Sequence, residues 1–296
     1  MFPESRGRQV WRIVYPILIF LAIPNLVAFV AGLYQGIQYA IQSPDAFQNP
    51  AILNEFLVEW LAQNTLVLTM IGQLLCLAPL VPMWVSMRRR MPLFDRKASP
   101  TTLGLLAIPA FFGLSLLVGL LLSFVDVGEM YEALEAALSS GSVVIRFVTL
   151  AVVAPVVEEL CFRGIILNRS LSWMRPWTAV ILQAAMFGVG HMNLVQGLYA
   201  FAVGMMFGYL YLRFRNLWLC IIGHFAFNLP SVLLDIIKDT GVEITAIRVL
   251  IIGAGLLVAV FFLYRLPAAV PVTIFDNRRF PDQATPWQSP DTPERM

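Results

Sequence analysis

Long apolar stretches separated by short polar loops run from near the start of the sequence to residue 265. A helix that crosses a bilayer needs about 20 mostly apolar residues, and main-chain groups in lipid must be hydrogen-bonded within the chain. Because no segments alternate in polarity as the strands of a membrane barrel do, we predict an all-α fold, a polytopic transmembrane bundle of about eight helices. The expected helices cover about residues 13–36, 61–87, 102–125, 143–168, 177–192, 194–212, 216–237 and 246–265.

The charges in the loops indicate how this bundle is oriented. Cytoplasmic loops of membrane proteins carry an excess of lysine and arginine. With eight helices, the basic loops fall on one side and the acidic residues on the other, so both termini are expected in the cytoplasm. The basic residues are Arg6, Arg8, Arg12, Arg88, Arg89, Arg90, Arg96, Lys97, Arg169, Arg175, Arg213, Arg215, Arg265, Arg278 and Arg279, and the acidic ones are Asp126, Glu129, Glu132, Glu135, Asp235, Asp239 and Glu243.

The chain divides into four segments of different character. Residues 1–142 hold the N-terminal transmembrane helices and, at 128–140, a stretch with helical spacing and acidic residues, which we interpret as a short interfacial helix. Residues 143–237 contain the helices with unusual polar residues, and residues 238–266 contain the final helix. Residues 267–296, rich in proline and charge without an apolar period, are predicted to be a disordered cytoplasmic tail.

The composition agrees with a membrane protein. Hydrophobic residues make up 59% of the chain and charged residues 13%, with a mean hydropathy of +0.77, against about 45–50% and about 25% in soluble proteins. Membrane lipids are therefore the expected surroundings, and the net charge of +2 gives no sign of nucleic-acid binding. Cys76, Cys161 and Cys220 lie in apolar stretches without ligand-like spacing, so a disulfide framework is not expected.

Six polar residues interrupt the apolar helices of the segment 143–237. A charge at the centre of a bilayer costs at least about 2.5–3.5 kcal/mol, so such a residue indicates a functional site by default. Both histidines of the chain belong to this set. The residues are Glu158, Glu159 and Arg163 in one helix, His191 at the end of the next, and His224 and Asn228 in a third.

Helical spacing assigns faces to these residues. Glu159 and Arg163 are four residues apart and can form an ion pair, while Glu158 lies about 100° round the helix and can face a different neighbour. His224 and Asn228 share one face, and Phe187 packs one turn before His191. A plain structural interpretation stays open: the Glu159–Arg163 pair and Asn228 could tie helices together, and the histidines could be packing residues.

The set contains the groups that peptide hydrolysis by water requires. A glutamate in a partly dehydrated site suits a general base, which we assign to Glu158. His191 could hold the water or share its proton. His224 and Asn228 could donate hydrogen bonds to a developing oxyanion, and Arg163 would fix Glu159.

The order and spacing of these residues resemble a known family. Glu158-Glu159-x-x-x-Arg163, then Phe187-x-x-x-His191, then His224-x-x-x-Asn228 resembles the CAAX prenyl protease and bacteriocin-processing family of intramembrane proteases, also called the abortive-infection or type II CAAX protease family. The resemblance covers about residues 145–235 and makes the segment 143–237 a CAAX-protease-like catalytic core. It implies an eight-helix protease with a cavity open toward the cytoplasm, in which Glu158 and His191 activate water and His224 with Asn228 stabilises the oxyanion.

The role of a metal stays open in the sequence. The family is described both as a metalloprotease family and as using a metal-free glutamate mechanism. The chain has no HExxH motif, which favours the metal-free mechanism, yet His191, His224 and Glu158 could still form a three-ligand zinc site.

The expected depths of Glu158 and His191 in the membrane do not agree, since Glu158 is expected toward the cytoplasmic side and His191 toward the opposite side. Tilt, an unwound turn or a different helix start would be needed to bring them together.

The expected function is hydrolysis of a peptide bond in a membrane-associated or lipidated protein or peptide. If that substrate is a prenylated CAAX protein, the family resemblance implies release of its last three residues. Two alternatives remain. The chain could be a transporter or proton relay, because glutamate and histidine chains also serve those roles, although no inverted repeat is visible. It could also be a non-proteolytic scaffold, for instance one that confers bacteriocin immunity.

Overall fold

The computed structural model describes residues 5–43, 45–88, 100–139, 141–238 and 245–265, and within these ranges every regular element is a helix. This confirms the all-α fold. The predicted tail 267–296 and several of the loop charges lie outside the described residues. The elements are α1 (Arg6–Gln42), α2 (Asp45–Gln48), α3 (Pro50–Arg88), α4 (Pro100–Leu122), α5 (Glu129–Ser139), α6 (Val143–Arg146), η1 (Phe147–Val153), α7 (Ala154–Glu159), η2 (Leu160–Leu167), α8 (Asn168–Ser170), α9 (Pro176–Gly190), α10 (Leu194–Phe214), α11 (Leu217–Lys238) and α12 (Thr245–Arg265).

The helices fit a multi-pass integral membrane protein. In the described part of the chain, five helices are long and apolar enough to cross a bilayer, or six if α5 and the rod from residue 143 to 170 count as one broken span. Two shorter apolar helices, Pro176–Gly190 and Thr245–Ala259, add to these. Each of the eight predicted stretches overlaps one of these helical segments, so the count of eight is approximate rather than wrong.

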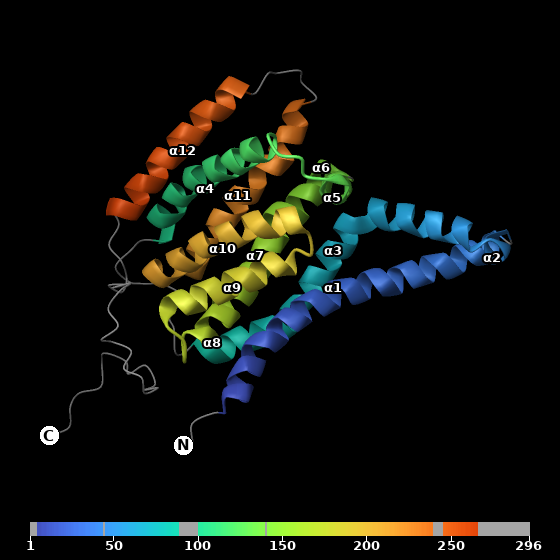
Figure 1. Cartoon of the computed structure of the whole chain (residues 1–296), viewed down its shortest axis with the longest axis horizontal. Coiled ribbons are helices and arrows are strands. Elements are labelled where there is room, and N and C mark those ends of the chain that lie inside the picture. Colours follow the sequence, from blue (N-terminus) through green and yellow to red (C-terminus); the bar gives the residue numbers. More distant parts are fainter. Residues whose placement is uncertain (1–4, 44, 89–99, 140, 239–244, 266–296) are drawn as a thin grey trace.

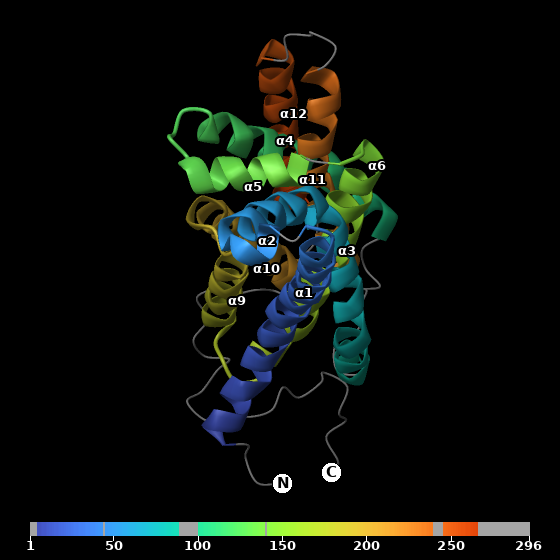
Figure 2. The same ribbon diagram turned by 90° about the vertical axis from the view of Figure 1, so that its right-hand side faces the viewer.

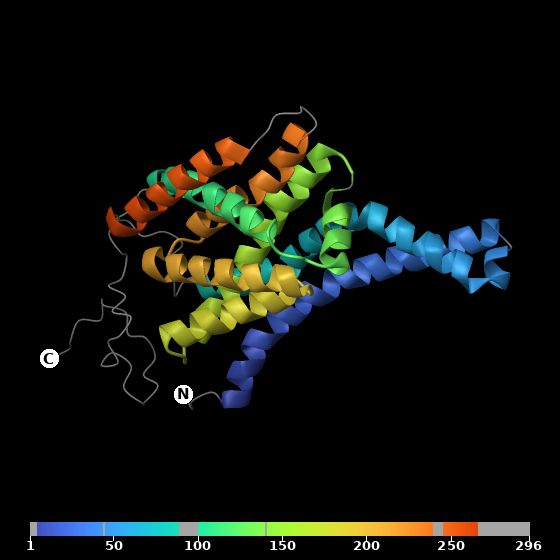
Figure 3. The ribbon, with the colours of Figure 1, turned by 45° about the horizontal axis from the view of Figure 1, so that its top comes forward.

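One long rod, α6 through α8, lies at the centre of the arrangement (Figure 1). Helices α9 and α10 pack against each other, and α4 packs against both α11 and α12 to form a second group. Helices α1 and α3 form an antiparallel hairpin that extends away from the rest, with α2 at its tip (Figure 3). The short helix α5 covers Glu129–Ser139, which confirms the helix predicted at 128–140. It runs across the direction of α1 (Figure 2).

Two stretches of π-helix, η1 and η2, flank the short α-helix α7 that carries Glu158 and Glu159. Hydrogen bonds there reach five residues back instead of four, as from the Ala154 amide to the Thr149 carbonyl. Such segments are rare and frequently accompany functional sites. Periodicity of the sequence predicted a regular helix here and missed both widened turns.

Candidate active site

A buried ion pair anchors the site. Glu159 and Arg163, both fully buried, lie 2.8 Å apart through Oε1 and Nη1, as their spacing predicted. The same Glu159 Oε1 accepts a hydrogen bond from His224 Nδ1 at 2.9 Å, which ties the rod to α11. Because this carboxylate is paired with arginine, Nδ1 of His224 carries the hydrogen, and its Nε2 is left to face the other direction.

Glu158 faces that second nitrogen. Its Oε2 lies 3.7 Å from His224 Nε2, just beyond hydrogen-bond distance and close enough to share a proton after a small shift. The neighbouring carboxylates therefore differ: Glu159 is sealed and paired, whereas Glu158 lines a pocket. This division matches the 100° that separates successive residues of a helix.

His191 reaches the same pocket from α9. It is the C-cap residue of that helix, and its Nδ1 lies 2.8 Å from the Phe187 carbonyl oxygen. Only a protonated Nδ1 can donate to a carbonyl, so the neutral ring keeps its Nε2 lone pair free to accept. The next residue, Met192, has a positive φ of 56°, a conformation that non-glycine residues adopt mainly where surrounding structure enforces it.

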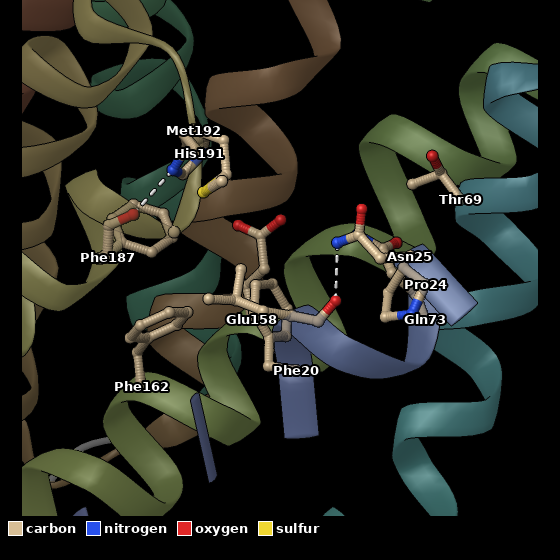
Figure 4. Close-up of a pocket in the computed structure, with 12 residues that line it drawn as sticks. Phe20, Pro24, Asn25, Thr69, Gln73, Glu158, Phe162, Phe187, His191 and Met192 are labelled. Atoms are coloured by element: carbon tan, nitrogen blue, oxygen red, sulfur yellow. Dashed lines mark hydrogen bonds between the residues drawn. The ribbon is translucent and has the colours of Figure 1, made fainter. Parts of the chain in front are cut away.

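The pocket is a cavity of about 180 Å³, room for several water molecules. Figure 4 shows the Glu158 carboxylate between His191 and Met192 on one side and Asn25 and Gln73 on the other. The residues that line it are Phe20, Leu21, Pro24, Asn25, Thr69, Gln73, Glu158, Phe162, Phe187, Gly190, His191 and Met192.

Phe187 packs at the centre of the polar groups. Its ring meets the His191 ring edge to face, with centroids 4.8 Å apart, as the spacing predicted. The Arg163 guanidinium carbon lies 4.7 Å from the same ring centroid, a cation–π contact, and the His224 ring lies 6.0 Å away. One aromatic ring thus contacts three of the predicted residues and fixes their mutual positions.

Asn228 is engaged differently from His224. Its Nδ2 donates to the Leu150 carbonyl at 2.8 Å. In a π-helix that carbonyl would be paired with the amide of residue 155, but residue 155 is proline and has no amide hydrogen. Asn228 therefore supplies the hydrogen bond that Pro155 cannot. The oxyanion role of Asn228 stays a prediction. In that role, either the second hydrogen of its amide or the amide after rotation would donate to the oxyanion.

The expected conflict in depth between Glu158 and His191 does not arise. The rod continues to Ser170, and α9 begins at Pro176 after a short turn. At 1.5 Å per residue, Glu158 lies roughly 18 Å and His191 roughly 22 Å from this shared turn. Depths measured from the connected ends of the two helices therefore agree.

A preformed metal site is not evident among the described residues. Within the described ranges, no group of three or more histidine, cysteine, aspartate or glutamate side chains is arranged to hold a metal ion. The hypothesis of zinc on His191, His224 and Glu158 therefore gains no support, and neither does the description as a metalloprotease.

Several polar residues near the site belong to none of the motifs and were not predicted. Gln183 is fully buried in α9 and donates to the Gly204 carbonyl at 2.8 Å, the same carbonyl that accepts from Arg163 Nη2 at 3.3 Å. Its presence in an apolar helix was a usable signal. Asn25, Thr69 and Gln73 lie far from the motifs in sequence, and only the packing of α1 and α3 brings them to the pocket.

Comparisons with known proteins agree with the motif resemblance. Residues 140–230 match the family model "Type II CAAX prenyl endopeptidase Rce1-like". A 95-residue part of the chain is 27% identical to the Bacillus subtilis (strain 168) protein named "Putative membrane peptidase YdiL". The matched part makes up 32% of this chain and 39% of that protein. No solved structure matches the chain significantly. The resemblance is thereby confirmed, and the matches support a membrane peptidase.

Proposed function

We propose that this protein is an intramembrane endopeptidase that hydrolyses a peptide bond of a membrane-associated protein or peptide with water. One observation carries the proposal: Glu158 and His191, from two different helices, line one pocket, and His224 Nε2 lies 3.7 Å from Glu158. A carboxylate and two imidazoles are costly to place within a membrane bundle, and such residues indicate a functional site by default.

Glu158 acts as the general base in this proposal. A water molecule between Glu158 and the Nε2 lone pair of His191 donates one hydrogen to each and directs its oxygen at the substrate carbonyl carbon. As the C–O bond forms, Glu158 takes one proton from the water. The hydrogen bond from His191 Nδ1 to the Phe187 carbonyl keeps the ring in the tautomer that this step needs.

The proton then moves to the leaving group. The tetrahedral intermediate carries a negative oxygen, which His224, when protonated at Nε2, and Asn228 stabilise by donating hydrogen bonds. Glu158 or His224 delivers the proton to the amide nitrogen, the C–N bond breaks, and a free acid and a free amine leave. Glu159 and Arg163 do not exchange protons; they hold His224 in place through Nδ1.

The lining of the pocket supports a substrate class. Phe20, Phe162 and Phe187 give it apolar walls among membrane helices, so a lipidated or membrane-inserted chain reaches it more readily than a soluble protein does. With the family resemblance, this favours cleavage close to a lipid-modified residue. For a prenylated CAAX substrate the released fragment would be the last three residues.

The test compares wild type, Glu158→Gln and a matched control, Glu59→Gln, in which an exposed glutamate of α3 is changed. Each protein is purified in detergent and incubated with lipidated and unmodified peptides, and products are identified by mass spectrometry. We expect cleavage by wild type and the control, and a loss of at least about 10²-fold in Glu158→Gln, as is typical for a general base.

Equal trimming by wild type and Glu158→Gln would overturn the proposal. A proton-coupled flux in liposomes that Glu158→Gln abolishes, without any cleavage, would indicate the transporter alternative instead. Metal analysis of the same wild-type sample tests whether zinc accompanies activity.

A further inference from the structure

The pocket has a second polar side, made by residues outside the family-matched segment 140–230. Asn25 of α1 and Thr69 and Gln73 of α3 line the cavity together with Glu158 and His191. Thr69 and Gln73 are four residues apart and so share one face of α3. In Figure 4 these three side chains lie across the pocket from His191, with the Glu158 carboxylate between them.

Gln73 is the distinctive member of this group. The residue is only 6% exposed, its Oε1 has no hydrogen-bond partner, and its amide makes no hydrogen bond with the part of the chain that the structure describes. Buried amides are almost always paired, so an unpaired one needs an explanation. Asn25, by contrast, already donates from Nδ2 to the Leu21 carbonyl at 2.8 Å.

The backbone at Gln73 is held firmly by the crossing of α1 and α3. A Cβ on the preceding residue, Gly72, would lie 2.5 Å from Pro24 Cα, so the two helices touch backbone to backbone at this point. The Gln73 amide is therefore presented from a fixed position, while its terminal torsion remains free to turn. Rotation about this torsion would turn Oε1 toward the cavity that Gln73 lines.

We propose that Gln73 is a substrate-binding residue that recognises the main chain of an extended peptide next to the scissile bond. Its Oε1 accepts a hydrogen bond from one peptide N–H of the substrate. A primary amide matches a peptide group in having one acceptor and donors in one plane, and an extended chain inside a membrane protein has unpaired N–H groups that must be satisfied. This inference rests on the proposed peptidase function.

The test uses peptides in which single backbone nitrogens around the cleavage site are N-methylated. With wild type, methylation at one position should lower kcat/KM by about tenfold, the value of one neutral hydrogen bond. In Gln73→Met, which keeps the length of the side chain, the unmodified peptide should already be cleaved about tenfold less efficiently, and methylation at that position should have no further effect.

The control is Gln63→Met, an exposed glutamine on the same helix that is hydrogen-bonded to Glu59, which should retain the full methylation penalty. The penalty is a ratio measured within one variant, so incomplete folding does not alter it; Gln73→Asn serves if Gln73→Met cannot be purified. An unchanged penalty in Gln73→Met would overturn the inference while leaving the peptidase intact. Failure of wild type to cleave any peptide, or cleavage by Glu158→Gln, would overturn the proposed function and this inference with it.

Discussion

At the scale of single residues, the hydrogen bond from Asn228 to the Leu150 carbonyl is a repair of the helix. Pro155 removes the amide that would pair with this carbonyl in η1. A main-chain acceptor left unpaired inside a membrane bundle is unfavourable, so the asparagine on α11 completes the π-helix and locks α11 against the rod. Asn228 would thus be needed for folding whether or not it also contacts the reacting oxygen.

We predict that Asn228→Ala lowers the free energy of unfolding by about 1–3 kcal/mol, the cost of an unsatisfied buried group. The double variant Pro155→Ala/Asn228→Ala should recover much of this loss, because residue 155 then supplies the missing amide hydrogen. Thermal unfolding in detergent measures both. If the double variant is no more stable than Asn228→Ala, the repair interpretation is wrong.

Activity of the same two variants separates the two roles of Asn228. Restored stability with restored cleavage would mean that the asparagine acts only through the helix. Restored stability with cleavage still reduced by about 10²–10³-fold, as for a lost oxyanion donor, would assign it the catalytic role as well.

The site residues that belong to sequence motifs could be predicted from the sequence. The Glu159–Arg163 pair and the position of Phe187 beside His191 follow from spacing along one helix, and the structure has both. Gln73 could not be predicted, because its nearness to Glu158 depends on how two helices distant in sequence cross. The hydrogen-bond partner of Asn228 could not be predicted either, since it depends on a π-helical turn that has no recognisable sequence pattern.

At the scale of elements, the contact between α9 and α10 sets the position of His191. A Cβ on Gly188 would lie 2.6 Å from the Gly197 carbonyl oxygen and 3.3 Å from Phe201 Cβ. Small residues let membrane helices approach this closely. Because the amide of His191 bonds the Gly188 carbonyl, the place where the helices touch is also the place where the histidine is held.

We predict that Gly188→Ala pushes α9 and α10 apart, lowers stability by about 1–3 kcal/mol and reduces cleavage. The matched control is Gly119→Ala in α4, where a Cβ would have no atom within 4 Å; it should be neutral or more stable by about 0.5–1 kcal/mol. Thermal unfolding and peptide cleavage measure both. A Gly188→Ala protein as stable and active as wild type would show that this contact is not limiting.

Hydropathy predicted where helices lie better than where they end. The expected stretches 13–36 and 61–87 fall inside α1 and α3, which run from residue 6 to 42 and from 50 to 88. The apolar window marks only the part suited to lipid, whereas the helix continues into residues that suit the interface. The π-helix η1 was not predicted because residues 147–157 are apolar at almost every position, so a shift of the helix face leaves no change in the pattern.

At the scale of the whole molecule, the α1–α3 hairpin exceeds the thickness of a membrane. With 37 and 39 residues, the two helices are roughly 55–58 Å long, against about 30 Å for the hydrocarbon core. Tyr39 and Phe56 stack near the distal end with ring centroids 3.9 Å apart, so the helices stay together there. The excess length has to be taken up by tilt or by projection from the bilayer.

We predict that Arg8→Cys and Arg265→Cys react with an impermeant maleimide only from the cytoplasmic side, and Glu55→Cys only from the opposite side. This follows from the distribution of basic loops and from an even number of spans. The native cysteines at 76, 161 and 220 are buried, which keeps the background low. Labelling of Arg8→Cys and Arg265→Cys from opposite sides would require an odd number of spans.

The two widened turns on either side of α7 affect how relatives of this chain can be compared with it. One added residue rotates everything beyond it by about 100°. A homologue without η1 or η2 could carry the same Glu-Glu-x-x-x-Arg letters and still aim its carboxylates at acyl chains instead of at the histidine on α11. A single codon gained or lost within a transmembrane helix could thus create or silence such an enzyme while its signature stays intact.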